Sequence, residues 1–275
     1  MIRSKPPQAH FPTPCFPITS AFSCSLPVGK DKALGVHYVT MSNIKLFLDG
    51  ADRASMLEMA KNSAVHGFTT NPTLMRKSGV SDYRKFCREI LPELCGKPVS
   101  FEVFADDFPT MEKQAREIGT WGSNVYVKIP AINSKGESAA ELVKTLSHAG
   151  IPLNVTAVFT LEQSWEMTRS LKGGAPSILS VFAGRIADSG RDPLPTMLAS
   201  AEMCRDAGPQ VELLWASTRE AYNILQAEQV GCKIITVPMD VLKKALGFGK
   251  KTPWDLSLET VRTFVEDSKA AGFQL

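Results

Sequence analysis

Short apolar runs alternate with amphipathic stretches from residue 44 onward. The apolar runs are rich in β-branched and aromatic residues, which is typical of β-strands. They cover residues 45–49, 67–71, 98–104, 125–130, 152–158, 177–184, 211–217 and 233–238. The stretches between them repeat apolar residues at helical spacing, which predicts helices. These helices are expected near residues 53–65, 81–94, 108–120, 136–149, 161–171, 193–206, 219–228 and 239–246.

Strand and helix alternate eight times, which predicts an α/β fold with a parallel sheet and helices outside it. Eight is also the number of strands that closes a (β/α)8 TIM barrel, and this is the fold we expect. An open, doubly wound sheet is the alternative. No G-x-G-x-x-G turn follows the first strand, so the sequence does not indicate a dinucleotide site.

The two ends of the chain differ from this repeating part. Residues 1–40 are interrupted by six prolines and keep no helical or strand period, so we expect a disordered N-terminal extension. A transit peptide and a translation start at Met41 are alternatives for this segment. Residues 41–275 form the predicted barrel domain, and an apolar face over about 256–271 predicts one further helix at its end. That helix is expected to cover a barrel end or to dock on a neighbouring subunit of a homo-oligomer.

Composition and charge narrow the choice of partners. The chain of 275 residues has 31 basic and 28 acidic residues, of which four and one lie in residues 1–40. The remainder is therefore balanced, which does not favour nucleic acid. No apolar run approaches the roughly 20 residues that span a bilayer, so we expect no membrane partner. The six cysteines lack metal-ligand spacing, and we expect reduced cysteines, a cytoplasmic protein, no metal and no cofactor.

Lys128 lies in the middle of the apolar run Val125-Tyr126-Val127-Lys128-Ile129-Pro130. A buried ammonium group is costly unless it is paired or neutral. Burial favours the neutral amine, whose lone pair can attack a carbonyl carbon. The sequence therefore raises the hypothesis of a Schiff-base lysine. The alternative is an edge-strand lysine whose long stem reaches water.

Other predicted strands place polar or aromatic residues in phase with this lysine at their carboxyl ends, where barrel active sites lie. They are Asp49, Thr69, Asn71, Ser100, Glu102, Asn154, Thr156, Ser180, Phe182, Trp215 and Ser217. Each has a structural alternative as a helix cap, a turn former or a hydrogen-bonding group in a wet core. The inward face of the last strand, residues 233–238, cannot be assigned from the pattern.

This set suits carbon–carbon bond chemistry at a ketone. Asp49 and Glu102 are the inward carboxylates that can move protons while Lys128 forms and loses an imine. Asn71, Asn154, Thr156 and Ser180 are candidates to bind sugar hydroxyls. Arg185 and Arg219 follow inward-facing strands and suit a phosphate through forked hydrogen bonds. Surface ion pairing is the alternative for both arginines.

These residues lie in motifs that resemble those of the transaldolase family and occur in the family's order, over roughly residues 44–270. The motifs are Leu48-Asp49, Gly67-Phe68-Thr69-Thr70-Asn71-Pro72-Thr73, Val127-Lys128-Ile129-Pro130, Asn154-Val155-Thr156-Ala157-Val158-Phe159 and Phe182-Ala183-Gly184-Arg185. The resemblance implies a (β/α)8 barrel and a metal-free class I aldolase mechanism with sugar phosphates as substrates.

The resemblance also implies roles for single residues. Lys128 matches the Schiff-base lysine, Asp49 the acid/base for carbon–carbon cleavage, and Glu102 with Thr156 the pair that manages a catalytic water. The remaining matches are to substrate-contacting positions, with the two arginines at phosphate-binding ones. They are Thr69, Asn71, Asn154, Ser180, Phe182, Arg185, Ser217 and Arg219.

Members of the family differ in reaction. Transaldolases pass a dihydroxyacetone unit between sugar phosphates in the pentose phosphate pathway, whereas the similar fructose 6-phosphate aldolases release it. The resemblance links glutamate at position 102 and phenylalanine at position 182 with transfer, and the short barrel with the aldolase-type branch. Thr218 stands where an aromatic residue is usual, which leaves the specificity open. An aldolase and a non-catalytic sugar-phosphate-binding barrel are the alternatives.

Overall fold

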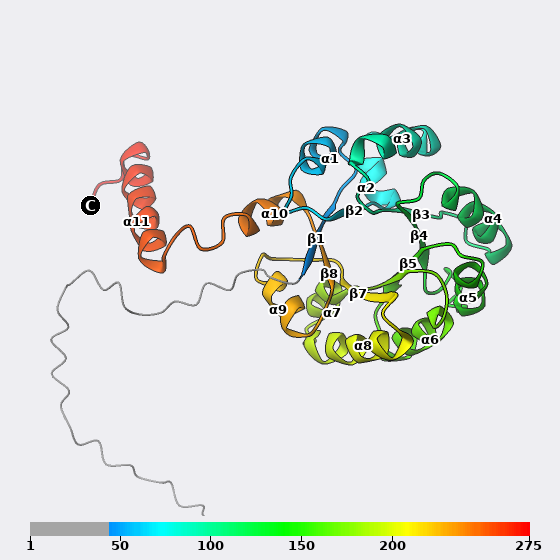
Figure 1. Cartoon of the computed structure of the whole chain (residues 1–275). Helices are drawn as coiled ribbons and strands as arrows, with labels where there is room; N and C mark the ends of the chain where they lie inside the picture. The colour runs from blue at the N-terminus through cyan, green and yellow to red at the C-terminus, as the bar shows by residue number, and fades with distance from the viewer. Residues whose placement is uncertain (1–43) are drawn as a thin grey trace, which may run out of the picture. The chain divides into compact units, whose positions relative to one another are not determined.

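A computed structural model of the chain describes residues 44–275. The predicted disordered segment, residues 1–40, lies outside the described residues. Eight parallel strands pair in chain order, and the first also pairs with the last, so the sheet is a closed barrel (Figure 1). The strands are β1 (Lys45–Asp49), β2 (Gly67–Thr69), β3 (Val99–Glu102), β4 (Val125–Pro130), β5 (Leu153–Val158), β6 (Ser177–Val181), β7 (Val211–Trp215) and β8 (Ile234–Val237). The TIM-barrel prediction is therefore confirmed, and the open sheet is excluded.

Helices connect the strands and lie around the outside of the barrel, and α10 and α11 follow the last strand (Figure 1). Their bounds are α1 (Arg53–Ala60), α2 (Pro72–Lys77), α3 (Tyr83–Ile90), the 3-10 helix η1 (Leu91–Leu94), α4 (Phe108–Gly119), α5 (Ala140–His148), α6 (Leu161–Leu171), α7 (Ala183–Asp188), α8 (Leu194–Ala207), α9 (Asn223–Gln229), α10 (Met239–Ala245) and α11 (Pro253–Ala270).

Two short helices, α2 and α7, were not predicted by the sequence pattern. Helix α7 begins inside a segment that we expected to be strand, residues 177–184, and α2 begins directly after another, residues 67–71. Asn71 still has an extended backbone, and its side chain caps α2, whose first residue is Pro72. Arg185 consequently lies on a helix, two residues beyond its start, instead of directly after a strand.

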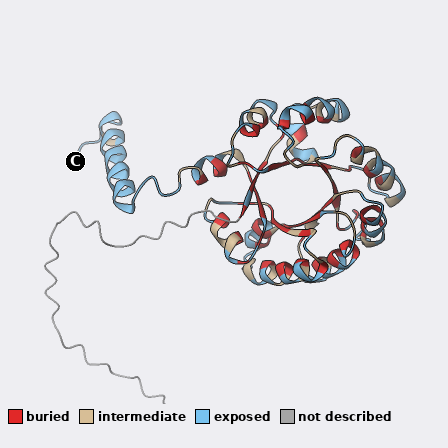
Figure 2. Cartoon of the chain, viewed as in Figure 1, coloured by how far each residue is buried: buried red, intermediate tan, exposed pale blue. Residues whose placement is uncertain are grey.

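The buried residues form two layers, one inside the barrel and one between strands and helices (Figure 2). The inner layer consists of Phe47, Ile178, Leu214, Ala216 and Ile234, with Tyr126 and Phe182 packed against it. A large aromatic ring at the barrel axis needs a small neighbour. Phe47 lies opposite Gly67 in the β1–β2 register, and a Cβ atom at Gly67 would overlap its ring.

The direction of Trp215 was predicted wrongly. Its neighbour in the register, Val181, belongs to the outer core, and Trp215 packs there too. Leu214 and Ala216 face the barrel interior instead. The alternation then stops, because Ser217 lies beyond β7 with a left-handed backbone (φ 63°). Strand alternation therefore does not support the predicted inward direction of Ser217.

Helix α11 begins with a capping box, in which the side chains of Thr252 and Asp255 each accept a hydrogen bond from the other's backbone N–H. None of its residues is buried. Its larger apolar side chains are exposed, from 40% for Leu258 to 77% for Trp254. Within the described residues, no helix is long and apolar enough to cross a membrane.

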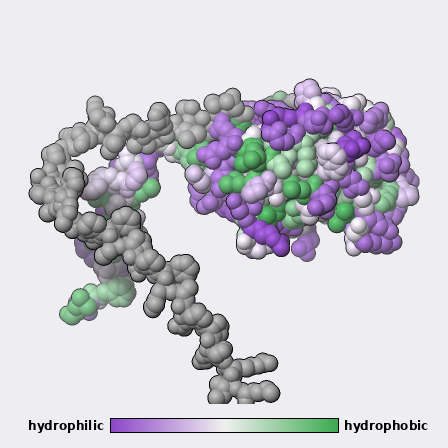
Figure 3. Space-filling view, turned by 90° about the horizontal axis from the view of Figure 1, so that it is seen from below, coloured by the Kyte–Doolittle hydropathy of each residue, from purple (hydrophilic) through white to green (hydrophobic). Residues whose placement is uncertain are grey.

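The barrel also exposes apolar side chains. Leu161 and Trp165 on α6 and Leu198 on α8 are 39%, 51% and 51% exposed. Helices α6 and α8 pack against each other, so these side chains belong to neighbouring elements. Figure 3, which faces the α8 side of the barrel, shows apolar surface between hydrophilic regions. We call Leu161, Trp165 and Leu198 the α6–α8 patch.

Candidate active site

Lys128 is buried inside the barrel, with 6% of its surface exposed. Its amine lies 3.2 Å from Glu102 Oε2 and donates a hydrogen bond to the carbonyl oxygen of Thr70 at 3.0 Å. The β3–β4 register sets Glu102 directly beside Lys128. Strand alternation in the sequence is therefore enough to predict that Lys128 and Glu102 both face inward. A closed barrel has no edge strand, which excludes the edge-strand alternative for Lys128.

Asp49 is the second carboxyl group inside the barrel. Burial raises the pKa of Asp49, while the charge of Lys128 and a hydrogen bond from Thr69 lower it by less. That hydrogen bond runs from Thr69 Oγ1 to Asp49 Oδ1 over 2.8 Å. Thr69 Oγ1 also contacts Thr236 Oγ1, so Thr236 donates to Thr69 when Thr69 donates to Asp49. The inside of the barrel thus holds one carboxyl group that resists ionisation near one amine.

A chain of buried polar groups crosses three strands beside Lys128. Ser180 Oγ donates to Asn154 Oδ1 at 2.6 Å, and Asn154 Nδ2 donates to Ser100 Oγ at 2.9 Å. Asn154 pairs directly with Lys128 in the β4–β5 register. Thr156 lies two residues further along β5, and its hydroxyl group is buried without a hydrogen-bond partner among the described residues. A buried hydroxyl without a partner is costly, which favours a water or a substrate group beside it.

Asn71 has an additional structural role. Its side-chain oxygen accepts a hydrogen bond from the backbone N–H of Leu74 at 3.0 Å, so it caps α2. The helix-cap alternative for this residue is therefore observed.

The two arginines differ in their partners. Arg219 forms a forked ion pair with Asp188, with Nε 3.0 Å from Oδ2, and this hydrogen bond lowers the pKa of Asp188. Arg185 has its guanidinium carbon 5.2 Å from the centre of the Phe182 ring. Phe182 packs on the inner barrel layer, so Arg185 is held next to the barrel mouth. Surface ion pairing, the alternative for both arginines, is observed for Arg219.

Sequence reasoning missed three residues of this site. Thr70 and Thr236 contact Lys128 and Thr69, and Tyr83 on α3 donates its hydroxyl hydrogen to the carbonyl oxygen of Glu102 at 2.9 Å. Thr236 was missed because all the other residues of β8 are apolar. Tyr83 lies on a helix and Thr70 accepts through its main-chain carbonyl, so strand alternation predicts neither contact.

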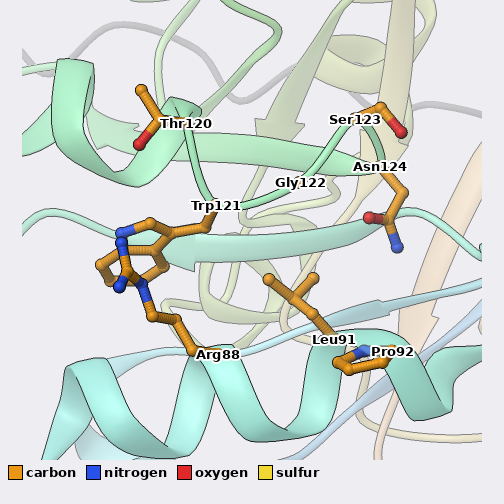
Figure 4. A pocket seen from close by; sticks show the side chains of 8 residues that line it. All are labelled: Arg88, Leu91, Pro92, Thr120, Trp121, Gly122, Ser123 and Asn124. Carbon is orange, nitrogen blue, oxygen red and sulfur yellow. The ribbon is translucent and has the colours of Figure 1, made fainter.

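Two cavities lie outside the barrel interior. One of about 460 Å3 is formed by α3, η1 and the loop before β4, with Arg88 and Trp121 among its lining residues (Figure 4). These segments lie at the amino-terminal ends of β3 and β4, away from the Lys128 site. The other, of about 370 Å3, includes Arg185 and lies beyond the carboxyl ends of β5 and β6.

The fold and the inner side chains define a class of protein. It is a (β/α)8 barrel that encloses a buried amine, two carboxyl groups and a set of hydroxyl and amide groups at the carboxyl ends of its strands. Barrel enzymes have their active sites at this end. In the part of the chain that is described, no three His, Cys, Asp or Glu side chains are grouped to hold a metal ion.

The chain belongs to the Transaldolase/Fructose-6-phosphate aldolase family, whose model matches residues 46–275. It is 36% identical over 203 residues to a "Probable transaldolase" of Dehalococcoides mccartyi, covering 74% of this chain and 90% of that protein. A "Probable transaldolase" of Methanococcus maripaludis is 37% identical over 73% of this chain and 89% of its own length. The family prediction is confirmed, and the family consists of enzymes of transaldolase or aldolase type.

Solved structures are similar in fold. The 3-hexulose-6-phosphate synthase of Salmonella typhimurium aligns with a TM-score of 0.52 at 11% identity, over 76% of this chain and 95% of that one. A putative deoxyribose-phosphate aldolase of Toxoplasma gondii aligns with a TM-score of 0.51 at 14% identity, over 76% and 95%. At such low identity the likeness concerns the barrel alone.

Proposed function

We propose that this protein is a transaldolase-like transferase that moves a dihydroxyacetone unit between sugar phosphates through a Schiff base on Lys128. The observation that carries the proposal is the buried Lys128 amine, 3.2 Å from Glu102 and in the electrostatic field of Asp49. Membership of the family supports the same chemistry.

The first half of the reaction forms the imine and cleaves the donor. Lys128 loses a proton to Glu102 and attacks the C2 carbonyl of a ketose phosphate, giving a carbinolamine. Glu102 returns the proton, water leaves, and Thr156 holds that water. Asp49 then takes the proton of the C4 hydroxyl group, the C3–C4 bond breaks, and an aldehyde departs. The bonding electrons stay as an enamine on the Lys128 nitrogen, so atoms and charge balance.

The second half runs the same steps in reverse with another aldehyde. The enamine carbon attacks the acceptor carbonyl, Asp49 returns its proton to the new hydroxyl group, and water hydrolyses the imine. Asn71, Asn154 and Ser180 are proposed to bind sugar hydroxyls, together with Thr69 and Ser217. For the phosphate, we propose Arg185 and Arg219, with Phe182 beside them. No metal or organic cofactor takes part in this scheme.

Borohydride trapping tests the proposal. The full chain is incubated with fructose 6-phosphate and reduced, and its intact mass and labelled peptide are then read. We expect a dihydroxyacetone-sized adduct on the peptide that carries Lys128. Lys128→Ala should give none, whereas the control Lys113→Ala, which changes an exposed lysine on α4, should give the same adduct as the parent chain. A folded parent chain that forms no adduct with any ketose phosphate would refute the Schiff base.

A fructose 6-phosphate aldolase activity is the second candidate. Both activities share every step up to the enamine, so the same residues serve both. The two are distinguished by omitting the aldehyde acceptor. Continued release of dihydroxyacetone at an undiminished rate identifies the aldolase, whereas a rate that depends on the acceptor identifies the transferase. Binding of sugar phosphates with neither adduct nor turnover would identify the non-catalytic barrel.

We further propose a cytoplasmic homo-oligomer that serves pentose phosphate metabolism. One observation supports the location and another the assembly. The described cysteines, Cys87, Cys95, Cys204 and Cys232, are all free, as expected in a reducing compartment. Helix α11 exposes an apolar face that has no buried residue. Cell fractionation tests the location, and a wholly extracellular or membrane-bound protein would contradict it.

A further inference from the structure

The inward face of β8, which the sequence pattern does not assign, carries a hydroxyl group. Ile234 belongs to the inner layer of the barrel, and Thr236 follows it two residues later on the same face of the strand. Thr236 also lies opposite Phe47 of that layer in the β1–β8 register. With 5% of its surface exposed, Thr236 is a buried polar residue inside the barrel, on a strand whose other residues are apolar.

The Thr236 hydroxyl group is the end of a short hydrogen-bonded chain that reaches Asp49. Its Oγ1 atom contacts Thr69 Oγ1, and Thr69 Oγ1 donates to Asp49 Oδ1 over 2.8 Å. Thr69 lies directly opposite Asp49 in the β1–β2 register. Among the described residues, Thr69 is the one hydrogen-bond partner of the Thr236 hydroxyl group. Thr236 therefore contacts the residue that binds the Asp49 carboxyl group.

The number of hydrogens in this chain limits its direction. A hydroxyl group donates one hydrogen and accepts up to two. The single hydrogen of Thr69 can point to Asp49 or to Thr236, but not to both. When Thr236 donates its own hydrogen to Thr69, the Thr69 hydrogen is left for Asp49. Hydrogen bonds in such a chain also polarise and strengthen one another, so Thr236 favours the ionised form of Asp49 through Thr69.

The main chain of Thr236 is held on both sides. Strand β8 pairs with β1 and with β7. The Thr218 hydroxyl group, beyond the end of β7, donates to the carbonyl oxygen of Thr236 at 2.7 Å. These contacts use the main chain of Thr236 and leave its hydroxyl group to Thr69.

Few charged groups act on Asp49 besides this chain. Lys128 on β4 lowers the pKa of Asp49, and Glu102 on β3 is paired with Lys128. Strands β2 and β8, which flank β1, contain no titratable residue. Helix α10 packs on β1, and its charged residues are all exposed. A substitution of Thr236 therefore changes the hydrogen bonding around Asp49 without changing any charge there.

We propose that Thr236 is a positioning residue for the catalytic carboxyl group, which holds the Thr69 hydroxyl hydrogen toward Asp49 and keeps Asp49 able to take the C4 hydroxyl proton of the substrate. The proposal rests on the proposed function and adds to it a residue that acts without touching the substrate. Thr236 acts through Thr69 alone, so its effect should disappear when Thr69 has no hydroxyl group.

The first test is the pH dependence of kcat/KM, with fructose 6-phosphate as donor and glyceraldehyde as acceptor. The acid limb of this profile reports the groups of the free enzyme that must be ionised. Thr236→Val keeps the shape of the side chain and removes the donor, which favours protonated Asp49. The acid constant read from the limb should fall about threefold, the size of one weak hydrogen bond, so that the limb moves to higher pH. Thr236→Ser restores the hydroxyl group and should restore the limb.

Two further variants separate this role from a structural one. Thr168→Val is the matched control, because it removes another buried threonine hydroxyl group, on α6. General effects of losing a buried hydroxyl group should appear there too, with the acid limb in place. Thr69→Val should move the limb at least as far as Thr236→Val. In the Thr69→Val background, Thr236→Val should move it no further, since residues that act as one unit are not additive.

A second measurement does not depend on turnover. The carboxyl carbon of Asp49 is followed by NMR while the pH of the folded full chain is changed, and its signal is assigned by its loss in Asp49→Asn. Thr236→Val should raise the midpoint of this titration, while Thr236→Ser and Thr168→Val keep the midpoint of the parent chain. If this pattern is found but the parent chain forms no product from any ketose phosphate, the proposed function fails and the hydroxyl chain stands.

An unchanged or lowered midpoint in folded Thr236→Val would overturn the proposal. So would an equal rise in Thr168→Val, or a further rise when Thr236→Val is added to Thr69→Val. Thr236→Ala, which also removes the hydroxyl group, gives the same comparison if the valine variant does not fold.

Discussion

Opposing effects act on the pKa of the Asp49 side chain. Its burial raises the pKa, and the Lys128 ammonium and the Thr69 hydroxyl oppose that effect. A carboxyl group that ionises reluctantly is suited to take up a proton and return it during one reaction cycle. The same burial makes its ionised form costly to the folded protein.

Asp49→Asn should therefore stabilise the protein at neutral pH while lowering activity. A pKa raised in the folded state means that the wild-type protein loses stability as pH rises from about 3.9, the ordinary value of Asp, through the folded-state pKa. The variant does not titrate, so its advantage should be absent at acidic pH and grow toward pH 8. Urea unfolding of both proteins at several pH values measures this difference.

Asp188→Asn is a control in which the pH dependence of stability should have the opposite sign to that of Asp49→Asn. Arg219 lowers the pKa of this exposed carboxyl group, so its contribution is present at neutral pH and is lost as pH falls through the folded-state pKa. The variant should be slightly less stable than the wild-type protein at pH 7 and equal at low pH. A uniform gain for Asp49→Asn at all pH values would contradict the explanation from burial.

Tyr83 supports Glu102 through the main chain. Tyr83→Phe removes the hydroxyl hydrogen that binds the Glu102 carbonyl oxygen, and we expect the free energy of unfolding to fall by about 1 kcal/mol. Thermal or urea unfolding measures it. Tyr222→Phe is the matched control, because Tyr222 is 54% exposed, and it should leave stability unchanged. Equal stability of the two variants would show that the hydrogen bond contributes little.

At the scale of the elements, the fit of Phe47 beside Gly67 joins β1 to β2. Gly67→Ala adds a methyl group that overlaps the Phe47 ring, and it should lower the free energy of unfolding by about 1–3 kcal/mol. Phe47→Leu in the same chain makes room, so the double variant should lose less than the sum of the two single variants. Denaturant unfolding of all four proteins tests this coupling. Strict additivity would mean that the ring and the glycine do not limit each other.

Strand alternation predicted the site where the strands are regular, and failed where they are not. Lys128, Glu102 and Asn154 lie within regularly paired strands, so their common direction follows from the sequence. Trp215 was assigned to the wrong face because aromatic residues suit both layers of a barrel. Ser217 lies past the end of β7, where a left-handed backbone breaks the period.

The remaining differences in the fold lie where strands end and short helices begin, and side-chain capping explains one of them. The sequence pattern extends β2 and β6 too far, to residues 71 and 184 instead of Thr69 and Val181. The Asn71 side chain and Pro72 start α2 instead, and Ala183 starts α7. Contacts made by hydroxyl groups and main-chain carbonyls, such as those of Thr236 and Thr70, depend on distances across the barrel. No one-dimensional pattern contains those distances.

At the scale of the whole molecule, α11 presents a face that the described barrel leaves exposed. Trp254, Leu258, Val261 and Val265 share that face by their spacing. The α6–α8 patch is apolar as well and is present on every copy of the chain. A helix of one copy that packs on the patch of another buries both surfaces, and such contacts close into rings when the rotation allows it.

We therefore expect the full chain to be a homo-oligomer that Leu258→Glu with Val261→Glu converts to monomers, because two carboxylates cannot enter an apolar contact without a large cost. Light scattering after size exclusion gives the mass directly. Thr263→Glu introduces one carboxylate on the opposite face of α11 and should leave the mass unchanged, and Trp165→Glu in the patch should act like the double variant. A monomeric parent chain would refute the interface. Dissociation by the α11 variant but not by Trp165→Glu would place the partner surface of α11 elsewhere than the α6–α8 patch.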